Sequence, residues 1–113
     1  MTLYTYLTTS EDPSIPIRWL DYAGAARDLS TGTYSVKLVN AAGKAVVTKT
    51  TGITGYSSLQ GTSPNTYNAL IQWSTGELAI TVGDYDLVFA HTVSSREALF
   101  PGEIKVRIKA VPT

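Results

Sequence analysis

Hydrophobic residues alternate with polar ones at intervals of two along four stretches of the chain, and this spacing is typical of half-buried β-strands. In the first stretch, Tyr34, Val36 and Leu38 share one face, and Ser35 and Lys37 share the other. The alternate apolar residues of the other three stretches are Tyr67, Ala69, Ile71, Trp73, Tyr85, Leu87, Phe89, Ile104, Val106 and Ile108. We therefore predict four strands that each turn one face toward a core.

Glycine and proline indicate where further strands begin and end. The sequence AAGK at 41–44 places a glycine turn between two strand-like runs, so residues 33–50 should form a β-hairpin. Residues 15–22 should form another strand. Because proline cannot donate a backbone hydrogen bond, Pro13 and Pro16 should make that strand begin late or lie at a sheet edge.

Two segments carry weaker patterns. Residues 51–66 are rich in Gly, Ser and Thr, and we expect a loop there with a short strand near 53–56. The segment SSREAL at 94–99 is the part of the chain with some helical character, and Pro101 would end any helical turn. Strands at intervals of 10–15 residues with glycine turns between them predict an all-β sandwich of about seven antiparallel strands.

The first fourteen residues form a separate unit in this prediction, and residues 15–113 form the sandwich domain. LYTYLTT has the composition of a strand, but SEDPSIP is a poor hairpin turn. Residues 1–14 are therefore either the first strand of the sandwich or an arm that pairs with a neighbouring subunit. In the second case the inter-subunit contacts would come from Leu3, Tyr4, Tyr6 and Leu7.

The predicted core combines the inward faces of the central strands. Its members are Trp73, Tyr85, Leu87, Phe89, Val106 and Ile108. Trp73 continues an apolar stripe, which favours a packed position. Trp19 has an apolar neighbour on the opposite face, Leu20, so it is also a candidate for an exposed aromatic that binds a ligand.

The charge composition changes which functions are expected. Lys and Arg number nine, Asp and Glu also number nine, and charged residues make up 16% of the chain, against about 25% in an average protein. A nucleic-acid-binding protein normally carries a basic excess, so we expect no nucleic-acid partner. A neutral, weakly charged chain has little electrostatic protection against self-association, which favours a homo-oligomer.

Lys105, Arg107 and Lys109 alternate with apolar residues and should lie on one face of the last strand. Asp84 and Asp86 should face these cations from a neighbouring strand, where opposite charges stabilise the pair. We interpret this basic stripe as a sheet surface that faces water or another subunit.

Candidate chemistry is sparse. The chain has no cysteine, which excludes disulfides and thiolate catalysis. His91 is the only histidine, and we expect a residue at the rim of its strand with one hydrogen bond. We predict no catalytic residue, no metal site and no cofactor. No signal peptide and no apolar run of the ~20 residues that span a membrane occur, so we expect a soluble protein without a membrane partner.

Three segments together resemble a known family. They are DLSTGTYSVKLVNAAGKAVV at 28–47, VGDYDLVFAHT at 82–92 and FPGEIKVRI at 100–108. The first segment has an Asp-Leu-Ser opening and a hairpin, the second a strand that starts with G-x-Y, and the third an aromatic-Pro-Gly step before the last strand. This order resembles the immunoglobulin-like domain of baseplate upper proteins of tailed bacteriophages and related virion modules. Those proteins carry the domain at the N-terminus of a longer chain, and their middle loop is shorter than residues 51–66.

The resemblance implies an immunoglobulin-like β-sandwich and a non-enzymatic structural protein of a phage virion, as a decoration, tail or baseplate component. Its partners would be other virion proteins and further copies of itself, and its location would be the virion, assembled in the cytoplasm of the bacterial host. The alternative is a β-sandwich module that binds carbohydrate or a host surface, with Trp19 and the seven tyrosines as candidate contacts.

Overall fold

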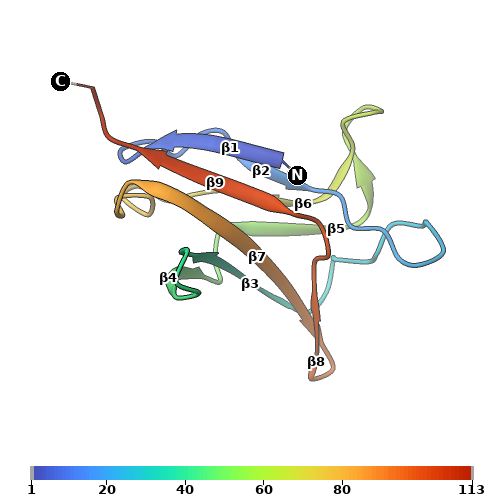
Figure 1. Ribbon diagram of the computed structural model, residues 1–113. Coiled ribbons are helices and arrows are strands. Elements are labelled where there is room, and N and C mark those ends of the chain that lie inside the picture. The colour runs from blue at the N-terminus through green and yellow to red at the C-terminus, as the bar shows by residue number, and fades with distance from the viewer. Residues whose placement is uncertain (1, 113) are drawn as a thin grey trace.

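The computed structural model describes residues 2–112, which fold into nine β-strands arranged as two sheets that face each other (Figure 1). No helix occurs within these residues. The strands are β1 (Thr2–Leu7), β2 (Ile15–Ile17), β3 (Thr33–Val39), β4 (Ala45–Lys49), β5 (Ile53–Gln60), β6 (Tyr67–Ile71), β7 (Gly83–Val93), β8 (Arg96–Leu99) and β9 (Ile104–Lys109). The prediction of an all-β sandwich is confirmed.

The larger sheet has six strands in the order β1-β9-β7-β3-β4, with β8 pairing β7 beside the end of β9. The smaller sheet has three strands in the order β2-β6-β5. All neighbours are antiparallel except β1 and β9, which run parallel. The strands β9, β7 and β3 therefore form the middle of the larger sheet, and β1 and β4 form its two edges.

The core lies between the two sheets, and its composition follows the alternation in the sequence. All six predicted core residues are buried: Trp73, Tyr85, Leu87, Phe89, Val106 and Ile108. The smaller sheet and its flanking segments contribute further residues that are completely inaccessible to solvent, among them Ile15, Leu29, Ala69, Ile71 and Leu78. Apolar surface removed from water in this way is the main favourable term in the free energy of folding.

The predicted hairpin at 33–50 is formed by β3 and β4. Its turn is built by Asn40, whose side-chain oxygen Oδ1 accepts hydrogen bonds from the backbone N–H groups of Ala42 and Lys44 at 3.0 and 2.9 Å. Gly43 has a φ of 83°, a left-handed conformation that glycine adopts without strain. The strand at 15–22 is shorter than predicted, and it lies at an edge of the smaller sheet as its prolines require.

Two segments differ from the prediction. Within 51–66 the loop was expected to dominate, yet β5 covers eight residues, because a register shift between Gly55 and Gln60 lets a Ser/Thr-rich strand continue along β6. The helical turn expected at 94–99 is wrong. Ser94 and Ser95 both have positive φ, the signature of a two-residue hairpin turn, and Arg96–Leu99 returns as β8 along β7.

Candidate functional site

The N-terminal segment lies in the chain's own larger sheet. Residues 2–7 form β1 and pair in register with Ile104–Lys109 of β9. Tyr6 is 1% exposed, and its hydroxyl group donates to the carbonyl oxygen of Pro13 and accepts from Trp73 Nε1 at 3.1 Å. Of the four residues proposed for contacts between subunits, Tyr6 is therefore a core residue, Leu3 is exposed, and Tyr4 and Leu7 are half-buried.

Trp19 is not an exposed ligand-binding aromatic, and that interpretation is corrected here. Its side chain is only 5% exposed. The ring packs edge-on against Phe89 and Phe100 at centroid distances of 5.8 and 5.6 Å, and the Arg27 guanidinium lies 4.7 Å from the ring centroid. Since its edges and a face are covered by this chain, a sugar ring cannot stack on it in this fold.

Asn68 explains why Trp19 is held inward. Asn68 is completely buried although it is polar, and its side chain replaces a missing strand partner. Its Oδ1 accepts the backbone N–H of Trp19, and its Nδ2 donates to the carbonyl oxygens of Trp19 and Arg27, each at 2.8 Å. Burying an amide whose hydrogen bonds are all made costs little free energy, whereas burying backbone groups without hydrogen-bond partners would destabilise the fold. The segment after β2 therefore stays against the core without being a strand.

His91 is also placed differently from the expectation of a strand rim. It is 1% exposed and stacks on Tyr34 with a centroid distance of 5.5 Å. Its Nδ1 accepts from Arg27 Nε at 3.3 Å, and its Nε2 lies 2.6 Å from the carbonyl oxygen of Thr31. Both ring nitrogens thus have protein partners, which makes His91 a structural residue of the core.

The basic stripe meets its predicted acidic partners. In the ladder of β7 and β9, Asp84 is opposite Arg107 and Asp86 is opposite Lys105. The Asp84–Arg107 pair closes at 2.8 Å and the Asp86–Lys105 pair at 2.7 Å. The hydrogen bond from Arg107 lowers the pKa of Asp84, and the hydrogen bond that Lys105 donates to Asp86 raises the pKa of Lys105. Cross-strand ion pairs therefore neutralise two of the three cations of the stripe.

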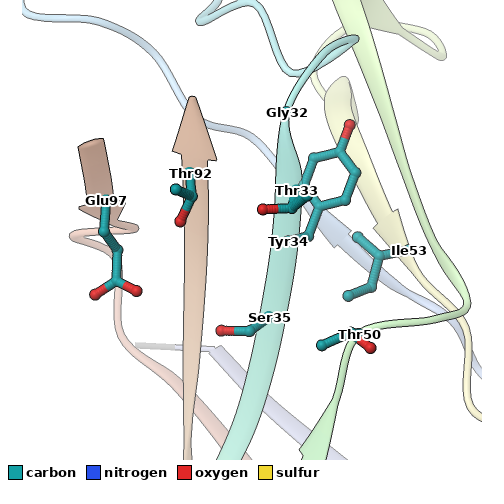
Figure 2. A pocket seen from close by; sticks show the side chains of 8 residues that line it. All are labelled: Gly32, Thr33, Tyr34, Ser35, Thr50, Ile53, Thr92 and Glu97. Atoms are coloured by element: carbon teal, nitrogen blue, oxygen red, sulfur yellow. The ribbon is translucent and has the colours of Figure 1, made fainter. Parts of the chain in front are cut away.

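A groove of about 590 Å³ opens along the beginning of β3 (Figure 2). It exists because β4 pairs with β3 only from Val36 onward, so Thr33–Ser35 have no strand on that side. The chain leaves β4 at Lys49 and crosses to the smaller sheet through Thr50. The hydroxyl groups of Thr33, Ser35, Thr50 and Thr92, the carboxylate of Glu97, and the side chains of Tyr34 and Ile53 line the groove with Gly32.

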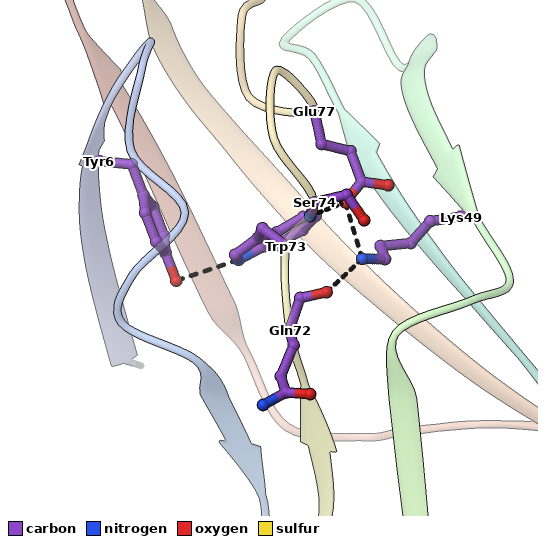
Figure 3. Close-up of polar contacts among 6 residues, drawn as sticks. All are labelled: Tyr6, Lys49, Gln72, Trp73, Ser74 and Glu77. Atoms are coloured by element: carbon purple, nitrogen blue, oxygen red, sulfur yellow. Dashed lines mark hydrogen bonds and ion pairs between the residues drawn. The ribbon is translucent and has the colours of Figure 1, made fainter.

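A buried ion pair joins the last residue of β4 to the segment between β6 and β7 (Figure 3). Lys49 Nζ lies 2.8 Å from Glu77 Oε1, donates to the carbonyl oxygen of Gln72 and lies 4.9 Å from the ring centroid of Trp73. The Lys49 side chain is 1% exposed and that of Glu77 is 21% exposed. Trp73 continues the network to Tyr6, whose pKa burial raises to about 12.

Sequence reasoning missed this ion pair, although a local signal exists. Residues 74–77 read Ser-Thr-Gly-Glu, a spacing at which the Glu side chain can reach back to the N–H of the first residue. Here Glu77 Oε1 accepts the backbone N–H of Ser74 at 2.7 Å, and Glu77 N–H donates to the Ser74 carbonyl oxygen at 3.0 Å. This turn fixes the carboxylate above Lys49.

A loop between β2 and β3 that is held by its own hydrogen bonds presents Tyr22 to solvent. The Tyr22 side chain is fully exposed. The loop is held by Asp21, whose Oδ1 accepts the N–H groups of Ala23 and Ala25 at 2.9 and 3.0 Å, and by a β-bridge between Leu20 and Ala26. Because these contacts already order the loop, less backbone has to be ordered when a partner binds Tyr22.

Within residues 2–112 no three His, Asp or Glu side chains gather closely enough to hold a metal ion, and no helix there has the length and apolar character of a membrane span. Comparisons with protein-family models, with curated proteins and with solved structures found no match to this chain. Functional inference therefore depends on the surfaces described above.

Proposed function

We propose that this protein is a non-enzymatic structural component of a tailed-bacteriophage particle, in a decoration, tail or baseplate position, and that it acts by protein–protein assembly. The proposal joins the resemblance in sequence with the surfaces that the fold leaves open. These surfaces are the edge of β1 and the loop that carries Tyr22.

One observation supports the proposal most directly. The three segments that carry the resemblance, 28–47, 82–92 and 100–108, fold into or lead into four strands that lie side by side in the order β9-β7-β3-β4. Segments far apart in sequence thus form one contiguous sheet of a β-sandwich, an architecture that immunoglobulin-like modules share. Both tryptophans are buried, so the aromatic surface expected of a carbohydrate-binding module is reduced to tyrosines.

The experiment is to locate the protein. Antibodies against the purified domain should label particles released by the bacterium that carries the gene, in immunogold electron microscopy and in density-gradient fractions. Signal at one repeated position on the particles is expected. A protein found only in particle-free fractions would refute the proposal.

A carbohydrate-binding or host-surface-binding module is the second candidate, and the groove beside β3 favours it. Several hydroxyl groups and the Glu97 carboxylate provide hydrogen bonds of the kind that sugars accept and donate. A glycan array tests this candidate. Binding should be abolished by Glu97→Ala and by Ser35→Ala, and preserved by Ser57→Ala, a change at an exposed position of β5. An array without signal would leave the assembly proposal as it stands and remove this one.

A further inference from the structure

Strand β1 presents a row of backbone hydrogen-bonding groups to solvent. It is the last strand in the order of the larger sheet, and no strand within residues 2–112 pairs with its outer edge. The N–H groups of Thr2 and Thr8 donate to carbonyl oxygens at the β9 side, each at 3.1 Å. Because N–H groups alternate along a strand, those of Leu3, Thr5 and Leu7 point to the open edge.

This edge lacks the features that normally protect exposed strands from pairing. Charged side chains, proline, bulges and shortness are the usual devices. The edge strand β2 has three residues and contains Pro16, β4 is opposed by a bulge at Leu38 and Val39, and β5 has an irregular register. By contrast, β1 has six residues, TLYTYL, without a charge or a proline.

The sequence of this edge reads the same in both directions. Residues 2–8 are Thr-Leu-Tyr-Thr-Tyr-Leu-Thr, with Thr5 at the centre. Two antiparallel copies of a strand are related by a two-fold axis, which places each residue opposite its mirror position. A palindromic strand therefore meets a copy of its own pattern when the axis passes through Thr5.

We propose that the protein forms a two-fold symmetric homodimer in which β1 pairs antiparallel with the β1 of a second copy, centred on Thr5. In this register Thr5 faces the second copy's Thr5, and Leu3 faces the second copy's Leu7. These residues carry the outward-pointing N–H groups, so they become the hydrogen-bonded pairs of the new ladder. The two larger sheets join into one continuous sheet through the dimer.

The side chains on the outer face agree with this register. Leu3 is 43% exposed and Leu7 is half-buried on the outer face, and the pairing brings each against the leucine of the other copy. On the inner face Tyr4 lies opposite the second copy's Tyr6, which stays buried in its own core. The carbonyl oxygen of Leu7 already accepts the N–H of Ser10 at 2.9 Å, and its second lone pair remains for the ladder.

This dimer does not depend on the virion assignment, because it follows from β1 alone. A protein that is dimeric but absent from phage particles would refute only the proposed function. A monomer found in particles would refute only the dimer.

The test uses the full chain and analytical ultracentrifugation. The wild type should sediment at twice the 12.1-kDa mass of the chain. Thr5→Lys should be a folded monomer, because the exposed Thr5 side chain can carry a charge, yet two lysines would meet at the axis. Thr48→Lys, an exposed position on the opposite edge strand β4, is the matched control and should remain a dimer.

A charge exchange tests the register. Thr5→Glu alone should be monomeric, and an equimolar mixture of Thr5→Lys and Thr5→Glu should restore a dimer, because opposite charges then meet at the axis. The circular dichroism spectrum of each variant reports whether it is folded. A monomeric wild type at the highest concentration that stays in solution, a dimer that persists in folded Thr5→Lys, or a mixture that stays monomeric would each overturn the proposal.

Discussion

Removing the carboxylate of Glu77 should destabilise the protein more than removing the charge of Lys49, although the two groups form one ion pair. The reason is the difference in burial. The Lys49 side chain is 1% exposed, whereas that of Glu77 is 21% exposed and also accepts the N–H of Ser74. Without Glu77 a cation stays buried with only the Gln72 carbonyl oxygen and the Trp73 ring beside it. Without Lys49 the carboxylate still reaches water.

The expected magnitudes follow from measured effects of buried ion pairs. Glu77→Ala should lower the free energy of unfolding by about 3–5 kcal/mol, because breaking a buried pair leaves an uncompensated charge. Lys49→Met keeps most of the apolar stem and should cost about 1 kcal/mol, the net value of an ordinary hydrogen bond. The double variant should lose less than the sum of the two single variants, with a coupling of about 2 kcal/mol between contacting residues.

Equilibrium unfolding in urea measures these differences, with the fluorescence of buried Trp19 and Trp73 as the signal. The slope of the free energy against urea should be the same for all variants, so that only the midpoint moves. Asp84→Ala, which removes an exposed ion pair with Arg107, is the control and should leave the midpoint nearly unchanged. Equal losses in Glu77→Ala and Lys49→Met, or a larger loss in Lys49→Met, would refute the assignment of unequal burial.

Four further predictions concern the core, a close contact, a tyrosine and the basic stripe. Phe89→Ala should cost about 3–5 kcal/mol in urea unfolding, since Phe89 is 1% exposed; an unchanged midpoint would contradict this packing. Gly55→Ala should cost about 1–3 kcal/mol, because a Cβ there would overlap the backbone of the loop before β3; a neutral effect would contradict that approach. The pKa of Tyr6 is raised from 10.0 in the unfolded chain to about 12 in the fold. The contribution of this group to stability is therefore complete below pH 10 and is lost as the pH rises toward 12. Melting temperatures measured from pH 9 upward should fall less steeply in Tyr6→Phe than in the wild type. Lys105→Ala with Lys109→Ala should leave both the melting temperature and retention on a DNA column as in the wild type, and salt-sensitive DNA binding that only the wild type shows would contradict a solvent-facing stripe.

Alternation of period two predicted most of the fold because the strands are half-buried and their inward residues are large and apolar. It also predicted that Asp84 and Asp86 would meet the basic stripe. It failed at 94–99, where two serines with positive φ make a hairpin turn that propensity rules assign to Asn and Gly. For β5 the sequence predicted only the short strand near 53–56, because the Ser/Thr-rich continuation lacks an apolar stripe.

The positions of the functional candidates depend on contacts between distant segments, and the spacing of apolar residues does not predict such contacts. Trp19 is buried because Asn68, 49 residues away, binds its backbone on both sides. His91 is buried because Arg27 and the Thr31 carbonyl oxygen satisfy its ring nitrogens. For the N-terminal segment the sequence left two arrangements open. The buried Tyr6 hydroxyl and its bond to Trp73 are tertiary contacts that only the fold reveals.

The parallel pairing of β1 with β9 has a consequence for how the chain reaches its native state. The register joins Tyr4 to Val106, almost the whole length of the chain apart. Contacts at such separation carry the largest loop-closure entropy and tend to form late. Until β1 docks, β9 is itself an edge strand, and Lys105, Arg107 and Lys109 line it at every second position. Charged side chains are one of the devices that protect a bare strand edge from pairing with other chains, so the basic stripe with its two ion pairs protects the sheet against aggregation until β1 docks.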